Sequence, residues 1–177
     1  MNFHFGSARS GERTAYGART PDASAASILE WSDFMRARGV TRVCCLLDAG
    51  QLAGFPVNLE AEYKRLFGAA NVLMESIADH HLCSRHALSA RILPFLSAAD
   101  AAGERAVIHC WGGNGRTGHV LAAWLVAARG LSPMEAIAAV EAAGRLPREA
   151  VLAGNATDDE LIDLLASCEP DGAAKRD

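Results

Sequence analysis

The sequence has no excess of positive charge and no long apolar run. Its 177 residues include 17 Lys and Arg against 21 Asp and Glu, which gives a formal net charge of −4. A chain with this charge is not expected to bind nucleic acid through the phosphate backbone. No uncharged apolar stretch reaches the length of about 18 residues that a membrane helix needs, so no membrane association is expected.

Signals for export and a complete set of disulfides are also missing. The first eleven residues contain no apolar core of the kind that secretory signals carry. The five cysteines are an odd number, which favours free thiols and a cytoplasmic location. Half of the residues are hydrophobic, enough for one domain with its own core. We therefore expect a monomer with one domain over residues 1–170. Residues 1–20 should be irregular with edge strands, and residues 171–177 should form a frayed tail.

Strand and helix patterns alternate along the chain. Apolar, β-branched segments predict buried strands over 40–47, 71–77 and 105–109. Helical patterns occur over 22–38, 58–67, 84–102 (interrupted by Pro94) and 116–129, and capping boxes at Ser132 and Thr157 begin two more helices. This alternation predicts an α/β domain whose mainly parallel central sheet is flanked by helices. Such sheets bind ligands beyond the carboxyl ends of their strands, which directs attention to the loops after residues 47, 77 and 109.

The loop after the third predicted strand carries the strongest motif. Its sequence is His109-Cys110-Trp111-Gly112-Gly113-Asn114-Gly115-Arg116-Thr117-Gly118. A cysteine six residues before an arginine is expected by chance about 0.4 times in a chain of this composition. Adding the preceding His, the Gly and the following Thr lowers the chance to the order of 10⁻⁴, so the full pattern is specific.

The residue types in this loop fit the binding of an anion. Gly112, Gly113 and Gly115 allow the backbone to turn so that successive N–H groups face one concavity. The predicted helix that follows adds the positive end of its dipole. Arg116 offers a planar fork that matches two phosphate oxygens. Cys110 would lie at the bottom of this positive bowl, where the thiolate is stabilised and faces the bound phosphate.

The segment from His109 to Thr117 resembles the H-C-x5-R-[ST] signature of the cysteine-dependent protein phosphatases, in particular the compact dual-specificity and small protein-tyrosine phosphatases. The order of strands and helices over about residues 40–144 is similar as well. The resemblance implies a protein-tyrosine-phosphatase-like fold and hydrolysis of phosphate monoesters through a cysteinyl-phosphate intermediate. It implies that Cys110 is the nucleophile and Arg116 the phosphate clamp, that Thr117 assists departure of the thiolate, and that His109 orients the loop.

The phosphate-binding residues implied by the motif are Trp111, Gly112, Gly113, Asn114, Gly115 and Arg116. Because this loop, the helix end and the guanidinium supply positive charge, we expect no metal and no cofactor.

Such a mechanism also needs a general acid, for which two aspartates are candidates. Asp79 follows the second predicted strand and lies 31 residues before Cys110, which is similar to the spacing of the acid in the family. Asp48 follows the first predicted strand, where a role as a helix or turn cap is common. We favour Asp79, although the Trp-Pro pair that often precedes the family's acid is absent.

Three other interpretations compete with a cysteine-dependent phosphatase. The run of His80, His81, Cys83 and His86 has ligands for a zinc site, but a polar loop is the simpler reading. The segment 113–118 also fits G-x-G-x-x-G, yet a capping box stands where the dinucleotide fingerprint needs a second strand. A phosphate-binding module without catalysis would not need the nucleophile, the hydroxyl and the acid, which are all present.

The substrate is the least determined part of the prediction. The loop contains no Lys, and Arg116 is its only cation, which disfavours highly charged inositol phosphates. A phosphorylated protein is the substrate that the resemblance implies, through a protein-tyrosine or dual-specificity phosphatase. A small phosphorylated metabolite is the alternative.

Overall fold

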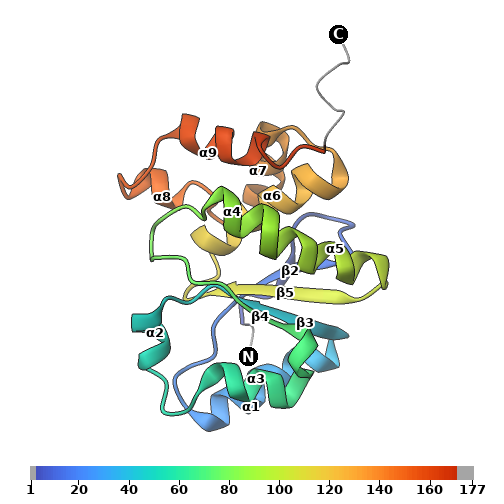
Figure 1. The fold of residues 1–177 in the computed structure, drawn as a ribbon, viewed down its shortest axis with the longest axis vertical. Helices are drawn as coiled ribbons and strands as arrows, with labels where there is room; N and C mark the ends of the chain where they lie inside the picture. The colour runs from blue at the N-terminus through green and yellow to red at the C-terminus, as the bar shows by residue number, and fades with distance from the viewer. Residues whose placement is uncertain (1–2, 171–177) are drawn as a thin grey trace.

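The computed structural model describes residues 3–170, in which a five-stranded sheet lies between two layers of helices (Figure 1). The strands are β1 (Gly6–Ser7), β2 (Ala15–Arg19), β3 (Val40–Cys45), β4 (Val72–Met74) and β5 (Arg105–Cys110). They lie in the order β1-β2-β5-β3-β4, and every neighbouring pair is parallel except the antiparallel pair β1 and β2. The predicted α/β fold with a mainly parallel sheet is confirmed.

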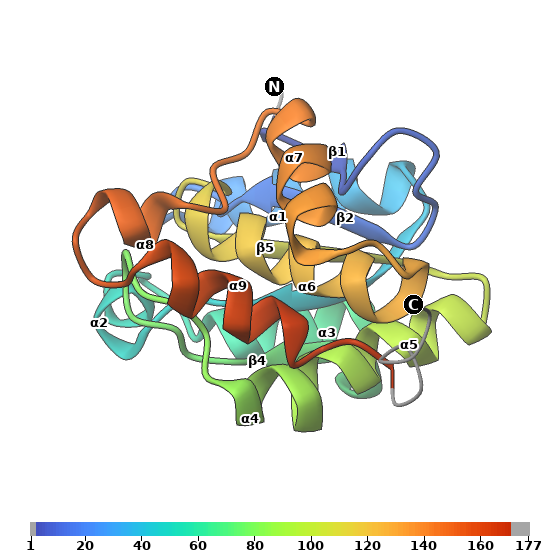
Figure 2. The same cartoon turned by 90° about the horizontal axis from the view of Figure 1, so that it is seen from above.

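The two faces of the sheet are covered by different helices. One face carries α1 (Ala25–Ala37) and α3 (Leu59–Phe67), and the short α2 (Ala49–Ala53) lies beside them. The other face carries α4 (Arg85–Ala87), α5 (Leu93–Ala101), α6 (Gly115–Arg129), α7 (Pro133–Ala142), α8 (Glu149–Leu152) and α9 (Asp158–Ala166) (Figures 1 and 2). None of the helices within residues 3–170 is long and apolar enough to cross a membrane.

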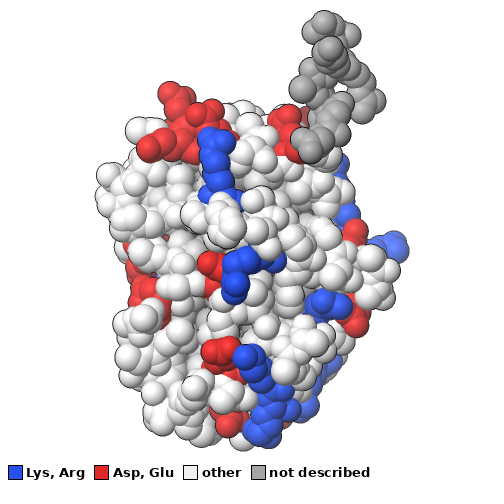
Figure 3. Space-filling view, viewed as in Figure 1, with Lys and Arg blue, Asp and Glu red and all other residues white. Residues whose placement is uncertain are grey.

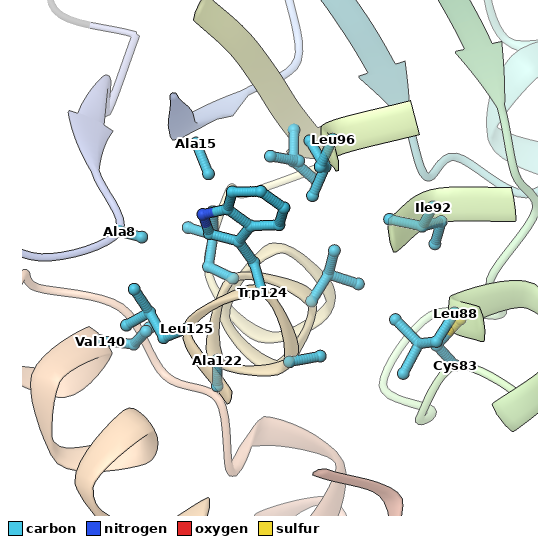
Figure 4. Close-up of a cluster of buried hydrophobic side chains, with 14 of the residues drawn as sticks. Ala8, Ala15, Cys83, Leu88, Ile92, Leu96, Ala122, Trp124, Leu125 and Val140 are labelled. Carbon is cyan, nitrogen blue, oxygen red and sulfur yellow. The ribbon is translucent and has the colours of Figure 1, made fainter. Parts of the chain in front are cut away.

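Each layer has its own hydrophobic core. On the face of α1 and α3, Trp31 stacks on Tyr63 with ring centroids 5.3 Å apart. On the other face, the fully buried Trp124 of α6 lies among small and aliphatic side chains, including Ala15 of β2 and Leu96 of α5 (Figure 4). Because α6 is buried along most of its length, its first turn is held rigidly against the end of β5.

The sheet differs from the prediction at its edges. Residues 3–20 contain two strands, but only β1 is an edge strand, whereas β2 pairs with β1 on one side and β5 on the other. The segment 71–77 was expected to be a buried strand, yet β4 spans only three half-buried residues at the opposite edge. Strand neighbours are set by tertiary pairing, which a local pattern does not specify.

Helix ends follow the predicted capping chemistry closely. Asn58, Ser132 and Thr157 each accept a hydrogen bond from the backbone of the first helical turn. The helical pattern over 84–102 is split as expected, because a π-helical turn, Leu88–Ile92, precedes the helix that contains Pro94. The first helix begins later than predicted, after its cap Ser24. The short helices α2 and α8 were not predicted, and the expected frayed tail lies outside the described residues.

Candidate active site

In the loop that joins β5 to α6, the carbonyl groups are hydrogen-bonded to other described residues and the N–H groups are not. Among the described residues, no hydrogen bond uses the N–H group of any residue from 111 to 115 as its donor. The carbonyl oxygens of residues 110–115 all accept hydrogen bonds. Backbone N–H groups are the donors for three of them: Thr20 bonds Cys110 and Trp111, and Gly118 bonds Asn114. Side chains are the donors for the other three: His4 bonds Gly112, Arg145 bonds Gly113, and His119 bonds Gly115. N–H groups that have no partner among the described residues fit the anion nest that the sequence predicts.

Gly113 and Arg145 fix this turn from the side of the N-terminal strands. Gly113 has a φ of +74°, and a Cβ atom there would lie 2.5 Å from the carbonyl oxygen of Ala18. Only glycine fits both the angle and the close approach. The guanidinium of Arg145 bonds the carbonyl oxygens of Gly113, Gly17 (2.7 Å) and His4 (2.9 Å). Burial lowers the pKa of Arg145 to about 10, so it remains a cation behind the loop at neutral pH.

Cys110 lies at the end of β5, where it is almost completely buried. The Thr117 hydroxyl donates a hydrogen bond to its Sγ over 3.2 Å. A donor at this distance stabilises negative charge on sulfur. His109 points to the other face of the sheet, where its ring packs edge-on against Trp31 and Tyr63 with centroids 5.1 and 5.6 Å away. Burial lowers the pKa of His109 to about 3, so the ring is neutral and positions the strand through packing.

Arg116 brings the three predicted loops together. Its side chain is only 2 % exposed. Nη1 donates hydrogen bonds to the carbonyl oxygens of Ile77 (3.0 Å) and Leu46 (3.4 Å). Ile77 lies shortly after the end of β4, and Leu46 directly follows β3. Nη2 lies 2.8 Å from Oδ1 of Asp79. Its Nε atom is buried and has no hydrogen-bond partner among the described residues, so the Nε–Nη2 edge of the fork contacts only Asp79. A guanidinium placed in this way can bind an oxyanion against the loop.

The two candidate acids occupy different places. Asp79 lines the pocket beside Cys110 and is 42 % exposed. Asp48 instead caps α2, where it accepts a hydrogen bond from the Gln51 N–H over 2.9 Å. The Gln51 side chain joins the site, since its Oε1 accepts from Arg116 (2.8 Å) and its Nε2 donates to Asp79 (3.3 Å). This arrangement supports Asp79, and not Asp48, as the acid.

A pocket of about 210 Å³ opens over Cys110. It is lined by Asp79, His80, Cys110, Trp111, Gly112, Asn114, Arg116 and Glu149. Of the predicted phosphate-binding residues, Gly113 and Gly115 shape the turn but do not line the pocket. Its size suits a phosphate group with part of the esterified alcohol.

A buried histidine connects the nest to the loop that carries Asp79. The ring of His119 accepts a hydrogen bond from the Cys83 N–H at Nε2 (3.0 Å), and so its Nδ1 donates to the Gly115 carbonyl oxygen (3.1 Å). Burial lowers the pKa of His119 to about 4, which keeps this tautomer neutral. The contact fixes the end of the acid loop relative to the first turn of α6.

Four residues of the site were missed by the sequence reasoning: Gln51, His119, Arg145 and Glu149. Only Gln51 had a local signal, because it is the last residue of the capping box that Asp48 begins. The other three reach the site through contacts between segments far apart in the chain, such as Arg145 with Gly17.

The competing interpretations find less support in the geometry. No group of three His, Cys, Asp or Glu side chains within residues 3–170 is arranged to hold a metal ion. In the 80–86 run, Cys83 is buried and its N–H bonds His119, whereas His81 bonds the carbonyl oxygen of Asp79. The residues after α6 begin α7 and not the second strand that a dinucleotide fold needs.

Comparison with known proteins agrees with this geometry. The family model "PTP-SAK: Swiss Army Knife protein, DSP-PTPase phosphatase domain" matches residues 30–156. No curated protein matches the chain. Among solved structures, Tk-PTP in its active form is 26 % identical with a TM-score of 0.67, and the match covers 89 % of this chain and 92 % of that one.

Two further structures share the fold at lower identity. PTPMT1 in complex with PI(5)P is 17 % identical with a TM-score of 0.69, and the match covers 93 % of this chain and 96 % of PTPMT1. TpbA of P. aeruginosa, in complex with pTyr, is 18 % identical with a TM-score of 0.54, and the match covers 88 % of this chain and 87 % of TpbA. One fold therefore accommodates ligands as different as a phosphoinositide and phosphotyrosine.

Proposed function

We propose that this chain, which belongs to the DSP-PTPase phosphatase domains of the Swiss Army Knife type, hydrolyses phosphate monoesters through a cysteinyl-phosphate intermediate. The observation that carries the proposal is the loop of unpaired N–H groups around Cys110, with Arg116 beside it. Preorganised donors of this kind stabilise the negative charge of the reacting phosphoryl group without any rearrangement.

In the first step, the Cys110 thiolate attacks phosphorus while the bond to the ester oxygen breaks. Asp79 gives its proton to the departing oxygen. When phosphate oxygens bind Arg116, they take the guanidinium from Asp79 and place a dianion beside its carboxyl group.

In the second step, water attacks phosphorus and the bond to sulfur breaks. The Asp79 carboxylate accepts a proton from the water, and inorganic phosphate is released. The hydroxyl of Thr117, which donates to Sγ, stabilises the thiolate as it leaves. Each group begins the next cycle in its original protonation state.

For the substrate, we propose a phosphorylated protein side chain, with a small phosphorylated metabolite as the second candidate. The complex of TpbA with pTyr supports the former by analogy. Among the described residues, Arg116 is the only Arg or Lys that lines the pocket. This argues against an inositol lipid that carries several phosphates, although PTPMT1 was solved with PI(5)P.

The test is turnover of p-nitrophenyl phosphate with a chelator present. The change of Cys110→Ser should lower kcat by more than about 10³-fold, because a hydroxyl of ordinary acidity cannot replace a thiolate nucleophile. The matched control is Cys168→Ser, since Cys168 is a free cysteine that does not line the pocket. Comparable rates for the Cys110→Ser variant and the parent would contradict the assignment, and so would activity that requires an added metal.

A further inference from the structure

Glu149 brings a second carboxylate to the pocket. It begins α8, and its side chain packs so closely on Gly115 that a Cβ atom at that glycine would overlap its carboxylate. The Glu149 side chain is 25 % exposed and lines the pocket together with Cys110 and Trp111. A negative charge at this position weakens the binding of a phosphate dianion. The presence of Glu149 beside the phosphate-binding loop therefore needs a functional explanation.

No strong partner neutralises this carboxylate. Among the described residues it accepts no side-chain hydrogen bond, and its nearest ionisable neighbour is Nδ1 of His80 at 3.8 Å. His80 has a left-handed φ of +56°, and its carbonyl oxygen accepts a hydrogen bond from Asn155 over 3.0 Å. A non-glycine residue held in this region is a strained feature that often marks a functional site.

The mouth of the pocket is acidic overall. Among the described residues, the acidic side chains that line it are Asp79 and Glu149, and the only Arg or Lys is Arg116. Arg116 pairs with Asp79, so Glu149 has only the His80 ring as an ionic neighbour within residues 3–170. Arg148 is adjacent in sequence but bonds Asp158 and Glu141. In Figure 3, the left margin of the molecule between α8 and α2 shows acidic and no basic side chains.

An exposed aromatic ring lies at the same opening. Trp111 lines the pocket and is 47 % exposed, although its neighbours in the loop are small. An aromatic ring and a carboxylate that line the same pocket can together bind ammonium and guanidinium groups, through cation–π and charge attraction. Trp111 and Glu149 carry no positive charge, so they do not attract a second phosphate or a carboxylate of the substrate.

We propose that Glu149 and Trp111 select phosphate monoesters that carry a cationic group close to the phosphate. This inference rests on the proposed phosphatase function and specifies its substrate class. The cation can be an Arg or Lys beside a phosphorylated residue, or the ammonium group of a small amino-alcohol phosphate. Glu149 acts here as a specificity-determining residue.

The test compares kcat/KM for matched substrates in the parent and in Glu149→Gln. One set is a phosphotyrosine peptide with Arg, Ala or Glu on both sides of the phosphotyrosine. The other set is phosphoethanolamine against ethyl phosphate. The parent should prefer the cationic member by about fivefold at low salt, and less as salt increases. Glu149→Gln should turn over the cationic substrates more slowly and the neutral and acidic ones faster.

A matched control variant is Glu30→Gln, because Glu30 is exposed on α1, across the sheet from α8, and forms no ion pair among the described residues. It should leave the order of substrates unchanged. A preference in the peptide set alone identifies a protein substrate, and one in the small-molecule set alone identifies a metabolite.

Two results would overturn the inference: the absence of any preference for the cationic member in both substrate sets, or a loss of activity in Glu149→Gln that is uniform across substrates. The latter is what a purely structural role predicts. Failure of the parent to hydrolyse p-nitrophenyl phosphate contradicts the proposed phosphatase function instead, so the two failures are distinguishable.

Discussion

At the residue scale, Asp79 and Arg116 hold each other in a contact that substrate must change. Nη2 of Arg116 lies 2.8 Å from the Asp79 carboxylate, and Gln51 bonds both side chains. In the mechanism that we propose, the phosphate competes with Asp79 for Nη2 of Arg116. The release of Asp79 from Arg116 then frees its carboxyl group to protonate the leaving oxygen.

This arrangement predicts how Asp79→Asn depends on the leaving group. An alkyl phosphate needs the proton from the acid, so its kcat should fall by about 10²–10⁴-fold, whereas nitrophenolate leaves without much help and should lose far less. The measurement is kcat for a series of esters whose leaving groups increase in basicity.

Asp48→Asn is the matched control, because Asp48 caps α2. It should show the same dependence on the leaving group as the parent. A steep dependence for Asp48→Asn, with none for Asp79→Asn, would move the acid to the loop after β3.

How much of the site could be predicted depends on how local its chemistry is. Cys110, Arg116 and Thr117 share one short segment of the chain, so their spacing alone predicts the roles that we propose for them. Arg145 and Glu149 reach that turn from segments more than 30 residues later. Nothing in their own neighbourhoods indicates a site, since their positions depend on how α7 and α8 pack.

At the scale of elements, the capped helices were predictable and the edges of the sheet were not. The caps at Ser132 and Thr157 use hydrogen bonds within four residues, and the sequence specifies them completely. The place of β2 inside the sheet depends on its pairing with β5, about 90 residues later. That partner is chosen by the whole fold.

His119 connects two elements, and its burial predicts how stability changes with pH. Its pKa is lowered from the ordinary 6.5 to about 4. Between these pH values the ring is protonated in the unfolded chain but neutral in the folded protein. The free energy of unfolding should therefore be highest above pH 6.5 and decrease as the pH falls toward 4. The share that belongs to His119 is on the order of 3 kcal/mol.

The check is urea unfolding at pH 7 and at pH 4.5 for the parent and for His119→Gln. The variant should lose less stability between the two pH values than the parent. His86→Gln is the control, because His86 is exposed, and it should match the parent. An unchanged difference in His119→Gln would show that this ring does not carry the pH dependence.

At the scale of the whole molecule, Arg145 connects the C-terminal half of the chain to the N-terminal strands through the phosphate-binding loop. It bonds carbonyl oxygens of Gly113 in the loop and Gly17 in β2. Arg145→Met removes the guanidinium donor from these buried oxygens, at a cost of about 1–3 kcal/mol for each group that is left without a partner. We expect a lower free energy of unfolding and a weaker affinity for the oxyanion vanadate.

The measurement is urea unfolding together with inhibition by vanadate. Arg13→Met is the matched control, since Arg13 is exposed and has no ion pair among the described residues, and it should change neither quantity. A variant at Arg145 that loses stability but binds vanadate as the parent does would show that Arg145 supports the fold without shaping the loop.

The most direct test of the mechanism is to trap phosphorus on Cys110. The protein is mixed with an aryl phosphate, quenched within one turnover, and the peptide that contains Cys110 is examined by mass spectrometry. We predict one phosphoryl group on Cys110 in the parent and none in Cys110→Ser, with more of the intermediate in Asp79→Asn because the second step lacks its base. Turnover in the parent without phosphorus on Cys110 would contradict the account.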